Sequence, residues 1–220
     1  MKRLLPAAIP YAAVLIGMYA LRNIWLTMGL YHLGILAFML LRPNGPGRAA
    51  LLRGWRTGLG LVLGAVCVLS GVTIYFAFPL AAATGAAPAD ASASSAVSGL
   101  AGSLADFGVR GAGFWLLFGW YVAITPWIEE LFWRGRLSAG RLGTGRRGLD
   151  ASDILFAGYH VLVLLKFLQW PWTVLAFVSL AAVAWAWRWA MRATGGLAIP
   201  VVTHAVADIS TMIAVYLLMA

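Results

Sequence analysis

Long apolar runs, separated by short polar and arginine-rich gaps, dominate the hydrophobicity pattern of the chain. Runs of about 20 apolar residues are long enough to cross a hydrocarbon core of about 30 Å. Nothing alternates like a barrel strand, and an open sheet would leave backbone groups unsatisfied in lipid, so the runs are predicted to be helices. The expected spans are seven, at residues 4–21, 24–41, 58–82, 111–133, 152–169, 172–190 and 197–219. The predicted fold class is therefore all-α, a polytopic membrane protein with a polar intramembrane cavity.

Composition supports one integral membrane domain over residues 1–220, because 62% of the residues are hydrophobic and 10% are charged. Residues 1–110 are expected to hold three helices and a flexible loop, and residues 111–220 the helices that carry the candidate chemistry. The loop is expected at 83–110, where Ala, Ser and Gly predominate, with a short amphipathic turn near Leu100 to Phe107. The first run is longer than the apolar region of a signal peptide, so it is interpreted as a retained span.

The net charge of +9 is explained by orientation in a membrane. The basic residues lie in the gaps between apolar runs, and alternate gaps hold 13 and 3 of them. This positive-inside bias predicts a cytoplasmic N-terminus and an external C-terminus. Because orientation explains the basic residues, we do not expect nucleic acid as a partner. The lipid bilayer is the expected partner. Small size and the lack of eukaryotic targeting features favour a bacterial inner membrane.

Two adjacent carboxylates and an arginine lie at the end of the fourth apolar run, at Glu129, Glu130 and Arg134. Carboxylates in a membrane segment indicate a functional site, because they are costly in hydrocarbon. Glu130 and Arg134 are four residues apart and share one helix face, whereas Glu129 points about 100° away. We therefore expect Arg134 to hold Glu130 in a structural ion pair and Glu129 to face a cavity and act on a proton. An ordinary charged cluster at the membrane interface is the alternative.

Two later spans carry histidines inside apolar runs, His160 in the fifth and His204 in the seventh. At about 1.5 Å per residue both lie roughly 10–12 Å from the cytoplasmic ends of their spans, in the same half of the membrane as the glutamates. Phe156 shares a face with His160, and Asp208 shares a face with His204. A carboxylate and a histidine can activate water, and the second histidine with Asp208 can stabilise an oxyanion, as amide hydrolysis requires. His32 has no charged partner nearby in sequence and is interpreted as a packing residue.

Three motifs occur in order on successive predicted helices: Glu129-Glu130-x-x-x-Arg134, Phe156-x-x-x-His160 and His204-x-x-x-Asp208. In this the chain resembles the CAAX-protease and bacteriocin-processing family, also called the Abi family, of glutamic intramembrane proteases. The resemblance implies that Glu129 activates water with His160. It also implies supporting roles for Glu130, Arg134 and Phe156. It implies that His204 and Asp208 form the oxyanion site. Asparagine is usual where this chain has Asp208, so its role stays open between a protonated donor and a group that orients His204.

The resemblance implies an intramembrane endopeptidase that needs no metal or other cofactor and acts near the terminus of a membrane-associated or lipidated protein or peptide. Two other interpretations remain. A glutamate with His160 and His204 would make a three-ligand set for a zinc-dependent intramembrane hydrolase, although no His-Glu-x-x-His pair is present. The other is a membrane protein without catalysis, such as an immunity or scaffold protein. A transporter is less favoured, because the sequence shows neither inverted repeats nor broken helices.

Overall fold

The computed structural model describes residues 4–42, 48–83, 93–138, 148–168, 170 and 172–219, and within these ranges every regular element is a helix. The all-α prediction is confirmed for this part of the chain. The elements are η1 (Leu5–Ala7), α1 (Ala8–Val14), η2 (Leu15–Ala20), α2 (Ile24–Leu41), η3 (Arg48–Leu52), α3 (Thr57–Ala83), α4 (Ala93–Asp106), α5 (Ala112–Ala123), α6 (Thr125–Glu130), η4 (Leu131–Leu137), α7 (Ala151–Leu164), α8 (Trp172–Thr194) and α9 (Ala198–Met219).

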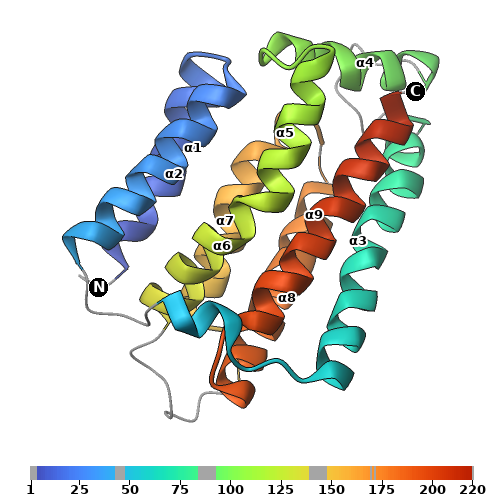
Figure 1. Cartoon of the computed structure of the whole chain (residues 1–220). Helices are drawn as coiled ribbons and strands as arrows, with labels where there is room; N and C mark the ends of the chain where they lie inside the picture. Colours follow the sequence, from blue (N-terminus) through green and yellow to red (C-terminus); the bar gives the residue numbers. More distant parts are fainter. Residues whose placement is uncertain are drawn as a thin grey trace.

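The longer helices run side by side in one bundle, and α4 lies across one end of it (Figure 1). Helices α1 and α2 form a pair at one edge. Helices α3 and α9 lie against each other at the opposite edge, with α5, α6 and α7 between the two pairs. At the crossing of α3 and α9, Ser210 Oγ donates a hydrogen bond of 2.7 Å to the carbonyl oxygen of Val68, and a Cβ at Gly71 would clash with Ser210. The small residue therefore sets how closely α3 approaches the helix that carries His204.

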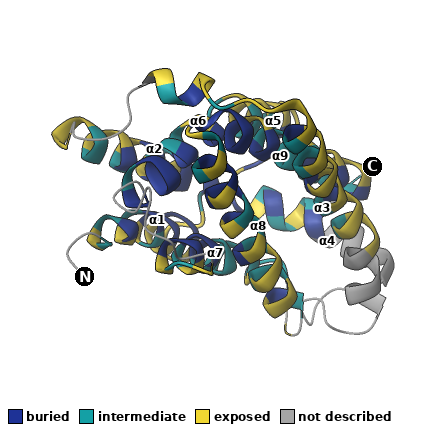
Figure 2. Ribbon diagram, turned by 90° about the horizontal axis from the view of Figure 1, so that it is seen from below, coloured by how far each residue is buried: buried dark blue, intermediate teal, exposed yellow. Residues whose placement is uncertain are grey.

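Four helical segments of the described chain are long and apolar enough to cross a membrane: Ile24–Leu41, Thr57–Phe76, Trp172–Thr194 and Ala198–Met219. Leu5–Ala20 and Ala151–Leu164 are apolar but shorter. The prediction of an integral membrane protein is supported, whereas seven spans are not confirmed. Buried residues face the middle of the bundle and exposed ones its outside (Figure 2), where large apolar side chains such as Leu33, Leu61 and Leu116 are exposed. That distribution suits a bundle surrounded by lipid.

The fourth predicted span, 111–133, is not one continuous helix. Helix α5 ends at Ala123, Ile124 has φ −119°, and α6 begins at Thr125 with Pro126 in its first turn. Proline has no N–H to donate to the preceding turn, which explains why the chain starts a new helix there. Helix α6 then passes into the π-helix η4. The first candidate motif therefore lies where a short α-helix changes to π geometry, a feature that is frequent at functional sites.

The structure differs from the flexible loop predicted for 83–110, because residues Ala93–Asp106 form α4. Leu100, Leu104 and Phe107 are buried at spacings of four and three residues, which places them on one helix face. The chain turns after this helix at Gly108, whose φ of 85° favours glycine. The helix is difficult to predict from a sequence rich in Ala, Ser and Gly, because only a narrow stripe of large apolar side chains runs along it. Residues 84–92 of the predicted loop lie outside the described residues.

The start of α7 is fixed by two interactions, a partly buried cap and a buried ion pair, that also position His160 further along the helix. Asp150 and Asp153 form a reciprocal capping box, in which the Asp153 carboxylate accepts from the Asp150 N–H at 2.9 Å. The same carboxylate accepts hydrogen bonds of 2.6–2.9 Å from the Arg188 guanidinium of α8, and both side chains are buried. Arg188 also donates to the Gly148 carbonyl at 2.8 Å. The fold thereby ties α7 to α8 beside the candidate site.

Candidate active site

The four side chains predicted to carry the chemistry come together in the structure, from α6, α7 and α9. His204 Nε2 lies 4.0 Å from Glu129 Oε2 and 3.8 Å from Asp208 Oδ1. The hydroxyl of Tyr159 lies 2.7 Å from Glu129 Oε1 and 3.2 Å from His160 Nε2, which joins α7 to the same group. The structure thus gathers side chains that are up to 79 residues apart in the chain.

Glu130 is held by two basic groups. Arg134 donates to Glu130 Oε1 at 3.0 Å, as the four-residue spacing predicts, and the two side chains are 2% and 0% exposed. His204 Nδ1 lies 2.9 Å from the same oxygen. The Arg134 guanidinium carbon lies 4.2 Å from the centre of the Phe156 ring and 5.0 Å from that of Trp187. Aromatic faces stabilise a cation that has been removed from water, so this is a structural ion pair in an aromatic box.

Glu129 is equally buried, with 2% of its surface exposed, but its surroundings differ. Its Oε1 accepts the Tyr159 hydroxyl at 2.7 Å, a short hydrogen bond of the kind that a carboxylate makes. Its Oε2 is buried without a hydrogen-bond partner among the described residues. A buried carboxylate oxygen left unpaired is costly. Glu130 Oε2 is also buried without a partner in the described ranges, so the difference between the two glutamates is that Glu130 is bound by Arg134 and Glu129 by a neutral hydroxyl.

His160 is oriented by its own helix. Its Nδ1 lies 2.8 Å from the Phe156 carbonyl oxygen, which can only accept, so the proton is assigned to Nδ1. In the neutral ring Nε2 is then an acceptor, and it lies beside the Tyr159 hydroxyl. The Phe156 and His160 rings are in contact, with centroids 4.5 Å apart, as their spacing predicts. The Tyr159 hydroxyl therefore lies between the basic nitrogen of His160 and the carboxylate of Glu129.

His204 and Asp208 form the third side of the site. The Trp187 ring stacks on the His204 ring, with centroids 4.5 Å apart and planes 22° apart. Because Nδ1 is directed at Glu130, the other nitrogen, Nε2, is directed at Glu129 and Asp208. Asp208 Oδ2 is buried and has no hydrogen-bond partner in the described part of the chain. The other oxygen, Oδ1, lies 3.8 Å from His204 Nε2, which is too long for a direct hydrogen bond and short enough for one oxygen to bridge the two groups.

Sequence reasoning missed Tyr159, Tyr31 and Trp187, which all contact the motif residues. Tyr159 is adjacent to His160 in the chain, and a hydroxyl inside an apolar span is the signal that could have found it. Tyr31 of α2 carries the same signal, because it is a hydroxyl inside an apolar span and is adjacent to His32, but nothing in the sequence places α2 beside α7. Its neighbour His32 is buried with Nδ1 2.9 Å from the Met28 carbonyl, in keeping with the packing role expected for it.

No group of three or more His, Cys, Asp or Glu side chains in the described ranges is arranged to hold a metal ion. His160 and His204, the nitrogen ligands of the zinc interpretation, each direct Nδ1 at an oxygen of the protein. Their Nε2 atoms remain directed into the site.

The chain has no significant match among curated proteins or among solved structures. Residues 111–210 match the family described as type II CAAX prenyl endopeptidase Rce1-like. This range contains α5, α6, η4, α7, α8 and most of α9, and hence all three motifs. The resemblance seen in the sequence is confirmed: over residues 111–210 the chain carries a domain of the Rce1-like family of membrane proteases, which is the CAAX-protease and bacteriocin-processing family.

Proposed function

We propose that the protein is a glutamic intramembrane endopeptidase that hydrolyses a peptide bond near the terminus of a membrane-associated or lipidated substrate. The observation that carries the proposal is the carboxylate of Glu129. It is buried, its Oε1 is bound by Tyr159, and its Oε2 has no hydrogen-bond partner among the described residues and is directed toward His204. A buried base oxygen next to a group that can donate a hydrogen bond is what the hydrolysis of an amide needs.

In the proposed reaction Glu129 Oε2 takes a proton from a water molecule as the water oxygen attacks the carbonyl carbon. His160 Nε2 accepts the second hydrogen bond of that water and so fixes its lone pair toward the substrate. The tetrahedral intermediate carries its negative charge on the former carbonyl oxygen. When the carbon–nitrogen bond breaks, the proton held by Glu129 passes to the leaving amine, which restores the carboxylate.

His204 is the proposed oxyanion donor through Nε2–H, which lies 4.0 Å from Glu129 Oε2 and so on the side from which the substrate oxygen would approach. Its Nδ1 already donates to Glu130, so a donating Nε2 requires the doubly protonated ring. Glu130 is the counter-charge that supports that form. Asp208 either donates from a protonated carboxyl or orients His204, and Asp208→Asn distinguishes these two roles.

The substrate class follows from the name of the family, whose members are type II CAAX prenyl endopeptidases. A peptide ending in a prenylated CAAX sequence is therefore the first probe for this chain. Peptide leaders, membrane-anchored precursors and terminal sorting signals are the further classes to test. In the proposed orientation the N-terminus is cytoplasmic and the site opens in the cytoplasmic half of a bacterial inner membrane, as the distribution of basic residues predicts.

The test compares wild type with Glu129→Gln in detergent on a library of these peptides, read by mass spectrometry, with and without a strong chelator. Asp106→Asn is the matched control, because Asp106 is an exposed carboxylate paired with Arg22. Cleavage by wild type and the control, none by Glu129→Gln and no effect of chelator is the expected result. Loss with chelator would favour the zinc hydrolase. No cleavage by wild type on any peptide class would favour the immunity or scaffold interpretation.

A further inference from the structure

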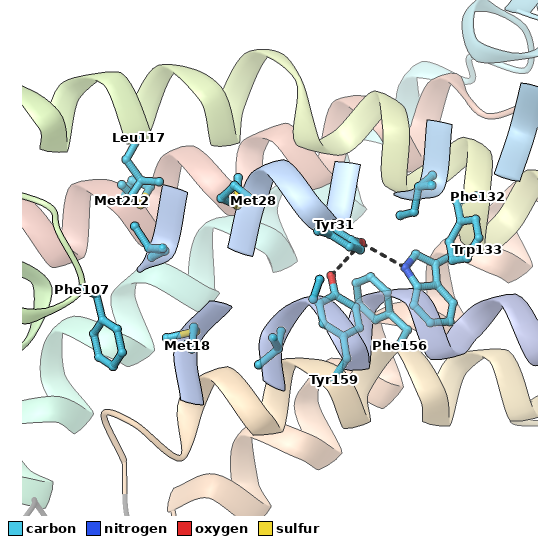
Figure 3. Close-up of a cluster of buried hydrophobic side chains, with 14 of the residues drawn as sticks. Met18, Met28, Tyr31, Phe107, Leu117, Phe132, Trp133, Phe156, Tyr159 and Met212 are labelled. Carbon is cyan, nitrogen blue, oxygen red and sulfur yellow. Dashed lines mark hydrogen bonds between the residues drawn. The ribbon is translucent and has the colours of Figure 1, made fainter. Parts of the chain in front are cut away.

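Helix α2 lies outside the residues that match the family, yet it reaches the candidate active site. The Tyr31 hydroxyl of α2 lies 3.2 Å from the Tyr159 hydroxyl of α7, and both side chains are 5% exposed. Figure 3 shows Tyr31 between Tyr159 and Trp133, with dashed lines to both. The polar ends of three large aromatic side chains therefore meet beside Glu129.

The donors and acceptors in this cluster fix the direction of the hydrogen bonds. The Trp133 indole N–H is a donor only, and it lies 3.4 Å from the Tyr31 oxygen, which must accept there. Tyr31 can then give its own proton to the Tyr159 oxygen. Tyr159 gives its single proton to Glu129 Oε1, the shortest contact in the series at 2.7 Å. Each hydroxyl that accepts one hydrogen bond becomes a stronger donor in the next.

Ring packing holds the chain of hydroxyls in place. The Trp133 and Tyr159 rings are stacked, with centroids 5.7 Å apart and planes 2° apart. The Tyr31 and Tyr159 rings are also in contact, with centroids 5.5 Å apart. Tyr159 is therefore unable to swing away from Glu129 unless its neighbours move. A carboxylate held at Oε1 in this way is restrained, with Oε2 on the side of His204.

We propose that Tyr31 and Tyr159 are positioning residues for Glu129, and that α2 completes the active site through the hydrogen-bonded series Trp133, Tyr31, Tyr159 and Glu129. This inference rests on the proposed function, in which Glu129 is the base. It assigns to the N-terminal part of the chain a role in the reaction besides its role in packing. It also means that the family-matched residues 111–210 do not hold the whole site.

The two tyrosines make different contributions, and Tyr31 provides the sharper test. Tyr159 contacts Glu129 and also His160, so its removal disturbs two groups. Tyr31 acts on Glu129 through Tyr159, and it also lies close enough to the carboxylate to interact with it directly. Tyr11 is the matched control, because its hydroxyl donates to the Leu155 carbonyl of α7 at 2.9 Å and takes no part in the series. Substitution of any of these three tyrosines by phenylalanine keeps the ring and removes only the hydroxyl.

The experiment measures kcat and KM for Tyr31→Phe, Tyr159→Phe, their double variant, Tyr11→Phe and Glu129→Gln on a peptide ending in a farnesylated CAAX sequence. Loss of a hydrogen bond to a charged group predicts a fall in kcat of roughly 100-fold for Tyr159→Phe and about 10-fold for Tyr31→Phe, with KM little changed. The double variant should lose less than the product of the two single losses. Tyr11→Phe should keep the wild-type kcat.

A second readout needs no substrate. Tyr159→Phe should lower the melting temperature of the wild type in detergent, and lower it much less in a Glu129→Ala background, where the acceptor is missing. If Glu129→Gln is inactive while Tyr31→Phe matches Tyr11→Phe, or if the losses multiply or appear in KM, the positioning role is refuted and the proposed function stands. If Glu129→Gln cleaves at the wild-type rate, the proposed function fails, and with it the positioning role, whatever the melting data show.

Discussion

The surroundings of the two adjacent glutamates differ although the residues are the same and both are buried. Glu130 is bound by a cation from its own helical segment, Arg134, and by His204. Glu129 is bound on one oxygen by a neutral hydroxyl from α7. The second oxygen of each glutamate has no hydrogen-bond partner within the described part of the chain, and that of Glu129 lies 4.0 Å from His204 Nε2. We expect the carboxylate that has a cation within hydrogen-bond distance to stabilise the fold, and the one that lacks such a cation to be available to a substrate. Burial alone therefore does not distinguish a structural carboxylate from a reactive one.

The largest effect should come from the Glu129 side of the site. Glu129→Ala and His160→Ala remove the proposed base and the nitrogen that orients the water, so each should lower kcat by about 10⁴-fold or more, to background. The variants should elute from a sizing column in detergent as the wild type does. Full activity in Glu129→Ala would show that the unpaired oxygen is not the base.

The next largest effect should come from the Glu130 side and should appear in stability. Arg134→Met leaves the Glu130 carboxylate buried without its cation, which should lower the free energy of unfolding by about 3–5 kcal/mol. Denaturant unfolding in detergent measures it. The matched control is Arg22→Met, which breaks an ion pair with Asp106 whose side chains are 65% and 61% exposed. An equally small change in both variants would mean that the buried ion pair does not hold the fold.

Removal of the oxyanion donor should have a smaller effect on the reaction. His204→Ala deletes one preorganised donor, for which a loss of roughly 10²–10³-fold in kcat is expected, with KM little changed. Steady-state kinetics on the peptide that wild type cleaves will measure it. If KM rose while kcat was kept, His204 would be a substrate-binding residue.

Asp208→Asn should have the smallest effect. An amide keeps a hydrogen-bond donor next to His204 and removes a carboxyl group beside the developing negative charge, so activity should be kept or raised. The measurement is kcat relative to wild type. A large loss would indicate that the carboxylate itself is needed, which favours the role in orienting His204.

The sequence predicts the parts of this site that depend on spacing within one helix. Glu130 with Arg134 and Phe156 with His160 are four residues apart, so helical geometry alone brings them together. The contact of Tyr31 with Tyr159 spans 128 residues and depends on how α2 packs against α7, which no local pattern encodes. The contact of Glu130 with His204 spans 74 residues and is of the same kind.

The fold shows the same division between local and tertiary information. Apolar runs predict helices because every backbone group in lipid must be satisfied internally. The break at Ile124 is indicated by Pro126, a local signal that the length of the apolar run concealed. Helix α4 depends on Leu100 and Leu104 packing against the rest of the bundle, and its small residues give only a weak periodic pattern.

The measurement that tests the account most directly is a comparison of Glu129→Gln with Glu130→Gln, in which the rate of peptide cleavage and the melting temperature in detergent are measured on the same samples. The account predicts that Glu129→Gln keeps the melting temperature and loses cleavage, whereas Glu130→Gln lowers the melting temperature because Arg134 loses its counter-charge. Cleavage at the wild-type rate by Glu129→Gln would contradict it.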